Sequence, residues 1–295
     1  MIVALFVLVN CALLASATKQ PTFENLNLST VEDFDSFVPK DSSAGPLTRL
    51  TLQGNYVSTG RPYSGFAAVF PPSRLAFYPT SKSGCVELVQ PSYSSYQTYD
   101  CEYATNGAFF TWDLTKTGSY CLGNLVSDGN VWQKPTDGTG TGRANIGIKS
   151  DGTIITGFLS QSTVNNTEFT QLITGYGWLV RNGQSYVKSS QDLSGFDDPN
   201  GFVNEKAPRT AVGVFQNGTI VLLEVDGEED INAGPDLWEM AELFVSLGVQ
   251  SAVNIDGGGS SVSVYKGEII DVPTCNDTPE VCERAVANIA CVKSI

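Results

Sequence analysis

Residues 236–262 read DLWEMAELFVSLGVQSAVNIDGGGSSV, and this stretch decides the fold. Its first half places apolar residues at helical spacing, and its middle, Ser251–Ile255, is a short apolar strand. Its end puts one carboxylate before three glycines and two serines. A helix that leads directly into a strand is typical of a mixed architecture in which the helix packs on a sheet.

The helix is predicted over residues 236–248. Asp236 is a suitable N-cap residue, Glu239 three residues later completes a capping-box pattern, and Gly248 is a C-terminal stop. Its apolar residues share one face, which we expect to pack on the sheet. They are Leu237, Met240, Ala241, Phe244 and Leu247.

Short β-type runs separated by turn signals dominate the chain from Thr48 onward. Asp151-Gly152 and Asn217-Gly218 each lie between two apolar runs. They predict β-hairpins with type I′ turns, because these residue pairs accept the positive φ that such turns require. With the helix, these runs predict a β-rich α+β fold of antiparallel or mixed sheets and hairpins, packed against one main amphipathic helix and stapled by disulfides.

Three segments are expected along the chain. Residues 1–17 predict an export signal peptide, because an apolar run ends in Ala15-Ser16-Ala17. Residues 18–46 are polar and acidic, and predict a loosely held arm or a propeptide-like segment. Residues 47–295 carry no Pro/Ser linker and are expected to form a single domain. No membrane span is expected in the mature chain, because no later segment holds about 20 apolar residues in a row.

Cysteine usage fits an exported protein. Of the seven cysteines, Cys11 leaves with the signal. An even number remains, which predicts three disulfides whose pairing stays open, although the close spacing of the fourth and fifth suggests a local bridge. The six are Cys85, Cys101, Cys121, Cys275, Cys282 and Cys291. Four glycosylation sequons also fit the secretory route, at Asn27, Asn165, Asn217 and Asn276.

The charge and the missing histidines exclude several functions. The formal net charge is −14 and there is no basic tract, which argues against nucleic-acid partners and anionic membrane surfaces. The chain has no histidine, so Ser-His-Asp and Cys-His nucleophile systems and His-based zinc sites are excluded. Acid–base chemistry must therefore use carboxylates, Tyr or Lys.

Polar residues follow several predicted strands, in stretches rich in glycine. They are Asn106, Arg209, Asp226 and Asp256. Each alone has an ordinary explanation as a turn residue or a solvated charge. Together they predict a phosphate site, because consecutive amides in a glycine-rich turn can form an anion-binding nest and the arginine fork suits phosphate. The carboxylate of Asp256 would then remain available for chemistry.

Several motifs, taken in order along the chain, resemble the phosphodiester glycosidase family. They are Asn106–Phe110, Cys121–Gly129, Pro208–Ala211, Asp236–Glu242 and Asn254–Ser260, within a resemblance that runs from about Cys85 to Val292. The resemblance implies a hydrolase that removes N-acetylglucosamine (GlcNAc) from GlcNAc-phospho-mannose diesters on glycoproteins and exposes mannose 6-phosphate. It also implies a protein of the secretory pathway, in the Golgi lumen or secreted, and it requires no cofactor or metal, although Asp226 and Asp256 together could coordinate an ion.

The resemblance also suggests roles for single residues. Asp256 is the first choice for the carboxylate beside the sugar C1 or the attacking water, with Asp226 and Glu239 as reserves. For Glu239 the capping box is an equally good explanation. The expected substrate and phosphate ligands are Arg209, Thr210, Asn106, Gly107, Gly257, Gly258, Gly259 and Ser260.

Two alternatives stay open at this point. The first is a secreted lectin-like module that binds phosphosugars without cleaving them, which would need the nest and Arg209 but no free carboxylate. The second is a glycosidase that acts on a different sugar phosphodiester.

Overall fold

The computed structural model describes residues 32–41, 43, 45–113, 118–134, 143–194, 201–274 and 282–295. Four of the predictions above fall outside these residues: the signal peptide 1–17, Asn27, Cys275 and Asn276. They stay predictions. No described helix is both long and apolar enough to span a bilayer.

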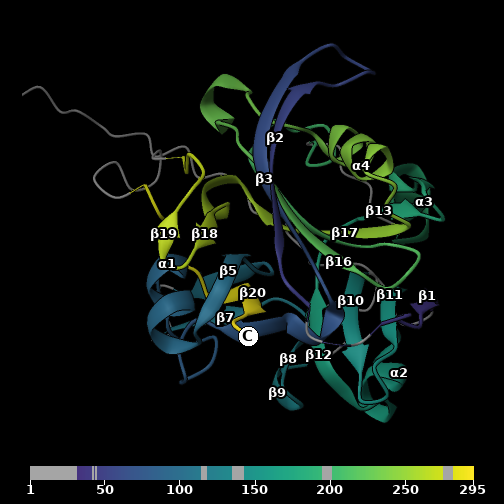
Figure 1. Ribbon diagram of the computed structural model, residues 1–295, viewed down its shortest axis with the longest axis vertical. Helices are drawn as coiled ribbons and strands as arrows, with labels where there is room; N and C mark the ends of the chain where they lie inside the picture. Colours follow the sequence, from purple (N-terminus) through teal and green to yellow (C-terminus); the bar gives the residue numbers. More distant parts are fainter. Residues whose placement is uncertain are drawn as a thin grey trace, which may run out of the picture.

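A seven-stranded sheet forms the centre of the molecule (Figure 1). Its order is β14 (Gln184–Ser185), β13 (Trp178–Arg181), β17 (Ser251–Gly257), β15 (Arg209–Val214), β16 (Ile220–Val225), β3 (Pro62–Phe70) and β2 (Thr48–Asn55). Successive residues of a strand point to opposite faces of the sheet and enter different hydrophobic cores: in β15, Ala211 belongs to one core and Val212 to the other. Both faces of the sheet are therefore buried, which explains why β16 is almost continuously apolar.

Helices cover one face of this sheet (Figure 1). They are α4 (Leu237–Ser246) and α3 (Val187–Ser194), and both contact β13. The predicted capping box of α4 is confirmed, since Asp236 Oδ1 accepts the Glu239 amide at 2.8 Å and Glu239 Oε2 accepts the Asp236 amide at 3.2 Å. Gly248 follows the helix with a φ of +80°, as a C-terminal stop requires.

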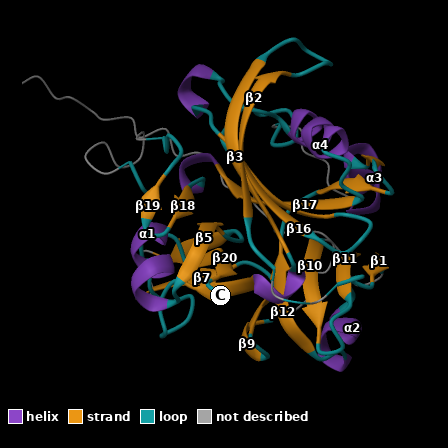
Figure 2. Ribbon diagram, viewed as in Figure 1, coloured by secondary structure: helices purple, strands orange, loops and turns teal. Residues whose placement is uncertain are grey.

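Two further sheets cover the opposite face (Figure 2). The six-stranded sheet runs β1 (Asp33–Phe37), β11 (Ile154–Phe158), β10 (Ala144–Lys149), β12 (Phe169–Thr174), β8 (Leu125–Ser127) and β9 (Asn130–Gln133). The five-stranded sheet runs β19 (Glu268–Ile269), β18 (Ser263–Tyr265), β5 (Cys101–Asn106), β20 (Asn288–Lys293) and β4 (Leu75–Pro79). One apolar cluster joins all three sheets.

The remaining elements are short. A two-stranded sheet pairs β6 (Phe110–Asp113) with β7 (Gly118–Cys121). The short helices are η1 (Pro72–Arg74), α1 (Pro91–Tyr93), η2 (Ser94–Thr98), α2 (Gln161–Asn166), η3 (Glu229–Ile231) and η4 (Gly258–Ser260). The predicted β-rich α+β fold with one main amphipathic helix is confirmed, and all described strand pairs are antiparallel.

Both predicted hairpins form, as β10–β11 and β15–β16, but their turns are not of type I′. Only Gly152 and Gly218 have positive φ, whereas a type I′ turn would require it at the preceding residue as well. Instead, the side chains of Asp151 and Asn217 each accept the amide two residues on, at 2.9 and 3.0 Å. A longer loop with glycine in the left-handed position therefore closes each hairpin.

Part of the predicted N-terminal arm is a sheet strand. β1 pairs with β11, and Arg181 donates hydrogen bonds to the carboxylates of both Asp33 and Asp35 at 2.7–3.2 Å. The acidic composition that suggested a loosely held segment instead supplies the two partners of one arginine. This difference concerns residues 33–37 of the segment 18–46.

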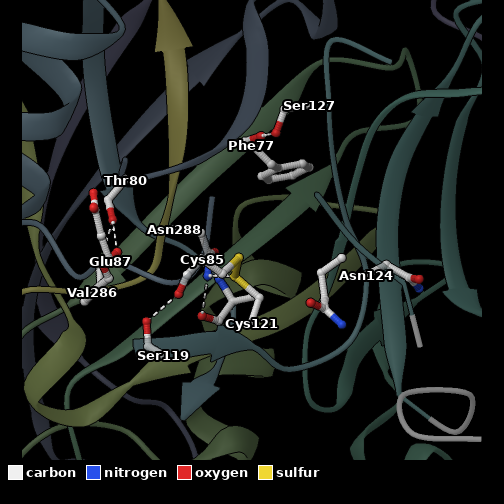
Figure 3. Close-up of a disulfide and its surroundings, with 12 residues drawn as sticks. Phe77, Thr80, Cys85, Glu87, Ser119, Cys121, Asn124, Ser127, Val286 and Asn288 are labelled. Carbon is white, nitrogen blue, oxygen red and sulfur yellow. Dashed lines mark hydrogen bonds between the residues drawn. A yellow bond between two sulfur atoms is a disulfide. The ribbon is translucent and has the colours of Figure 1, made fainter. Parts of the chain in front are cut away.

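Two disulfides join described cysteines, Cys85–Cys121 and Cys101–Cys291. Cys282 is also disulfide-bonded, and the predicted partner Cys275 lies outside the described residues. Figure 3 shows the first bridge, with the Asn288 side chain directed at Cys121 Sγ and the Ser119 hydroxyl at the Cys85 carbonyl. Asn288 thus connects this bridge to the loop after β5.

Removal of the Cys101–Cys291 bridge is expected to destabilise the protein more than removal of Cys85–Cys121. Cys101–Cys291 closes a sequence separation of 190 residues and Cys85–Cys121 one of 36. A longer closed loop restricts the unfolded chain more. Paired Cys→Ala variants should lose about 2–5 kcal/mol of unfolding free energy. Urea unfolding of both pairs checks the order, and a larger loss for the Cys85–Cys121 pair would contradict it.

Candidate active site

Asp256 lies at the end of β17, where two sheets meet. Its amide donates to the Gly107 carbonyl at 3.0 Å, and the Asn106 side-chain amide donates to the Asp256 carbonyl at 2.7 Å. Asn106 ends β5 in the five-stranded sheet, whereas Asp256 belongs to the seven-stranded sheet. The backbone of Asp256 is therefore fixed by both sheets, while its side chain is half-buried.

The pKa of the Asp256 carboxyl group is raised toward neutral pH. Burial raises its pKa to about 6, although Arg284, the Ser260 hydroxyl and the Gly257 amide each lower it. The Gly257 amide donates to Asp256 Oδ1 at 2.9 Å. Arg284 Nη1 donates to Ser260 Oγ at 3.1 Å, which places a guanidinium beside the same turn. The site thus combines one carboxyl with a raised pKa and a nearby cation.

Asn106 and Thr210 support this turn from inside the protein. Both are fully buried, and Thr210 Oγ1 donates to Asn106 Oδ1 at 2.7 Å. Thr210 Oγ1 also lies 3.5 Å from Ser261 Oγ. Their polar atoms bond to other groups of the protein, and the predicted contact of these side chains with a ligand stays a prediction. They position Asp256 and the residues that follow it.

Gly107 is needed for a close approach. A Cβ atom there would lie 2.1 Å from Asn288 Oδ1, which instead accepts the Ala108 amide at 2.5 Å. The Gly107 amide donates to the Asn288 carbonyl at 3.0 Å, and its carbonyl accepts Asp256. Both of its backbone groups are thus bonded within the protein, and Gly107 acts as a packing contact.

The expected anion nest is not formed by the first two glycines. The Gly257 amide is bonded to Asp256, and the Gly258 amide donates to the Pro208 carbonyl at 2.8 Å. An N–H group that already has a good acceptor does not serve a phosphate as well. Gly258 has a φ of +58°, and a Cβ atom there would lie 1.9 Å from Glu229 Oε1. Gly257 and Gly258 therefore allow tight packing, and a phosphate contact of the Gly259 amide stays a prediction.

Arg209 lies beside the glycine turn but is almost fully buried, with 1% of its surface exposed. Its Nη2 donates to the carbonyls of Phe202 and Glu205 at 3.1 and 3.0 Å, and to the Glu205 carboxylate at 3.2 Å. The guanidinium also stacks on the Phe202 ring at 4.4 Å, and burial lowers its pKa. Its charge reaches Asp256, whereas its Nη2 is occupied by protein acceptors.

Glu239 belongs to a different network, at the start of α4. Its carboxylate is 1% exposed and accepts hydrogen bonds from Thr59, Arg61 and Lys206 at 2.6–2.9 Å. Burial raises its pKa, but the bonds from Thr59, Lys206 and the Asp236 amide outweigh burial and lower it. The structure thus uses Glu239 to cap α4 and to hold the β2–β3 turn, and does not bring it to Asp256.

Asp226 joins a second acidic cluster with Glu224 and Asp271. The three carboxylates offer oxygens that all lie within 4.8 Å of one another. Burial is the main cause that raises the pKa of Asp271 to about 7 and the pKa of Glu224 well above its ordinary value, and the charges of neighbouring carboxylates contribute to both shifts. Glu224 is the cross-strand neighbour of Thr210. The acidic cluster and the turn that contains Asp256 therefore adjoin the same buried layer.

Several residues of the site were not predicted from the sequence: Arg284, Glu229, Glu224 and Asp271. Glu224 alone carries a signal, since it is the one charge in the apolar run Ile220–Val225. Arg284 and Asp271 lie outside helices and strands and Glu229 begins the short helix η3, and their contacts with β17 and β16 arise only from the fold. Of the predicted glycosylation sites, Asn165 and Asn217 are exposed, as modification would require.

Comparison with known proteins shows what the chain is similar to. Residues 99–293 match the sequence profile of the phosphodiester glycosidase family. Two curated relatives carry the name N-acetylglucosamine-1-phosphodiester alpha-N-acetylglucosaminidase. The Bos taurus protein is 41% identical over 201 residues, which cover 65% of this chain and 37% of that protein. The Homo sapiens protein is 38% identical over 205 residues, which cover 65% of this chain and 38% of that protein. The chain thus spans little more than a third of these relatives.

A solved structure covers more of the chain. The zebrafish catalytic domain of the enzyme with the same name, described as auto-inhibited by its pro-peptide, superposes with a TM-score of 0.77 at 29% identity. The match covers 89% of this chain and 88% of that domain.

Replacement of Asp256 by Asn is expected to stabilise the protein above pH 6. A carboxyl whose folded pKa lies above its unfolded value of ~3.9 contributes stability below ~3.9, and this is lost as pH rises through about 6. The neutral amide lacks this loss, so its advantage over the wild type should grow by up to ~3 kcal/mol between pH 4 and pH 7.

Urea unfolding of the two proteins across this pH range measures the difference. Asp192→Asn, at an exposed position on α3, serves as the control and should show no such trend. An Asp256→Asn effect that does not change with pH would contradict the raised pKa.

Proposed function

The chain belongs to the phosphodiester glycosidase family, and from this we propose that it hydrolyses the bond between C1 of N-acetylglucosamine and a phosphodiester oxygen. The inferred substrate is the GlcNAc-phospho-mannose diester on glycoprotein glycans, and the product is mannose 6-phosphate. The names of the bovine and human relatives support the sugar and the diester. No nucleic-acid partner is proposed.

The observation that carries this proposal is the half-buried carboxyl of Asp256, whose pKa is raised to about 6 at a point that two sheets hold rigidly. A general base works best when its pKa lies near the working pH, and the chain has no histidine to take this role. Asp256 is therefore our first choice for the catalytic residue. Asp226 remains second, because it faces other carboxylates.

The proposed reaction uses one water molecule. The water oxygen bonds to C1 while the bond between C1 and the phosphate oxygen breaks, and the bonding electrons leave with the phosphate. The proton of the water passes to the ionised carboxylate of Asp256. The departing phosphomonoester has a second pKa of ~6, so it leaves without the help of a strong acid. The negative charge of the Asp256 carboxylate would also stabilise the positive charge that develops on the sugar in the oxocarbenium-like transition state.

The phosphate is proposed to bind on the Ser260 side of the turn. Arg284 brings its guanidinium to the Ser260 hydroxyl, and a cation at this point would offset the charge that develops on the leaving phosphate. The Gly259 amide is proposed to assist. Arg209 is now proposed as a positioning residue, since its Nη2 holds residues 202 and 205 while its charge lowers the pKa of Asp256.

A secretory location is part of the proposal. The two described disulfides and the predicted signal peptide support folding in an oxidising compartment. We therefore place the activity in the Golgi lumen or outside the cell.

The central test is the release of N-acetylglucosamine from GlcNAc-α-phospho-mannose. Asp256→Asn should lower kcat at least about 10³-fold, and Arg284→Ala should mainly raise KM. The wild-type rate should rise with pH through about 6, because the ionised form of Asp256 is the active one. Asp192→Asn should retain full activity.

The other outcomes separate the alternatives. Binding of the diester by the wild type without turnover would favour a lectin-like module. Turnover of a different sugar phosphodiester would keep the enzyme class and change the substrate. Full activity of a folded Asp256→Asn protein would end the role proposed for that residue and direct attention to Asp226.

Glu239→Gln is expected to lower stability while leaving the activity of the folded protein unchanged. The change weakens the contacts with Arg61 and Lys206, and a broken buried ion pair costs about 3–5 kcal/mol at most. Thermal unfolding and a kcat measured well below the Tm separate the two effects. A selective loss of kcat would restore Glu239 as a catalytic candidate.

A further inference from the structure

Three carboxylates converge at a point that the proposed hydrolysis does not use. Glu224 lies in β16, Asp226 follows that strand, and Asp271 lies just after β19. Two segments of different sheets thus meet, the end of β16 and the chain after β19, and one oxygen of each of the three carboxylates lies within 4.8 Å of the others. A shared ligand would explain this convergence.

Few hydrogen bonds reach these oxygens within the described chain. Both oxygens of Asp271 are buried and have no well-formed hydrogen bond among the described residues, although the backbone amides of Ser263 and Asp271 lie near enough to lower its pKa. Glu224 is 1% exposed, and the Ser263 hydroxyl donates to its Oε2 at a distance of 3.5 Å. Asp226 accepts the Ser64 hydroxyl at 2.7 Å and the Val272 amide at 3.1 Å. Two almost unbonded carboxylates thus lie buried side by side.

Such an arrangement is costly unless something neutralises it. Unpaired buried charges are strongly unfavourable, and like charges at this distance repel one another. No ion pair joins any of the three to a lysine or arginine in the part of the chain that the structure describes. The neutralising partner is therefore either bound protons or a cation.

We propose that Glu224, Asp226 and Asp271 bind one calcium ion. Carboxylate oxygens are the ligands of hard cations, and calcium accepts six to eight oxygens in flexible geometry, including mono- and bidentate carboxylates. The Ser263 hydroxyl and water would complete the shell. Magnesium fits less well, because it demands near-octahedral geometry and keeps most of its waters.

The ion would fasten the chain after β19 to the end of β16. Val272 already bonds to Asp226 across this junction, and Ser263 connects β18 to Glu224. The cation would thus hold the five-stranded sheet against the seven-stranded sheet, beside the layer that contains Thr210. This stabilising role is separate from the proposed hydrolysis and does not depend on it.

Thermal unfolding of the full secreted chain tests the site without any activity assay. The wild type should melt several degrees higher in about millimolar calcium, the range typical of extracellular calcium modules, than in EDTA. Asp271→Asn should lose this shift. In EDTA the variant should melt at or above the wild type, because the repulsion is relieved. Asp192→Asn, with the same charge change at an exposed site, should keep the full calcium shift.

Terbium luminescence gives a second, local readout. The Tyr103 hydroxyl lies 2.9 Å from Ser263 Oγ, so this buried phenol should sensitise a terbium ion held by the three carboxylates. Calcium should displace the signal, and Glu224→Gln should abolish it. A wild type whose melting temperature ignores calcium and which gives no sensitised terbium signal would overturn the proposal, and bound protons would then neutralise the cluster.

Discussion

The hydrogen bond between the Asp256 amide and the Gly107 carbonyl, 3.0 Å long, is the constraint on which the arrangement of the site depends. It joins the end of β17 in the central sheet to the residue that follows β5 in the neighbouring sheet. Asn106 reinforces the joint through its side-chain amide, and Asn288 holds the other side of the same loop. The carboxyl of Asp256 is thus positioned by the packing of whole sheets, as the catalytic role proposed for it would require.

Buried carboxylates in this protein fall into two kinds. Glu239 is surrounded by cations and donors, and its pKa is lowered despite burial. Asp256, Glu224 and Asp271 have too few such neighbours, so burial dominates and their pKa values are raised. The first kind stabilises a helix end. In the second kind, the ionised form is destabilised by burial without full compensation from neighbouring groups. Groups with pKa values perturbed in this way are typical of functional sites.

Local sequence patterns predicted the local structure well. The capping box at Asp236, the helix stop at Gly248 and the two hairpins each depend on neighbours within a few residues, and all formed. The site was predicted only in part. Whether the amide of Gly258 is available depends on Pro208, some 50 residues away in sequence, and no periodicity reveals that contact. The position of Arg284 beside Ser260 likewise follows from tertiary packing.

The three glycines after Asp256 are therefore explained by space more than by ligand binding. A Cβ atom at Gly257 would lie 2.8 Å from the Pro208 carbonyl, and Gly258 combines a left-handed φ with the nearby Glu229 carboxylate. These close approaches let the Gly257 amide turn back onto Asp256 Oδ1, which fixes the orientation of the carboxyl group. A larger residue at position 257 would push the strand end away from Pro208 and weaken the bond from the Gly258 amide to the Pro208 carbonyl. The glycine run would thus act on the proposed chemistry indirectly, because it fixes the direction in which the Asp256 carboxyl points.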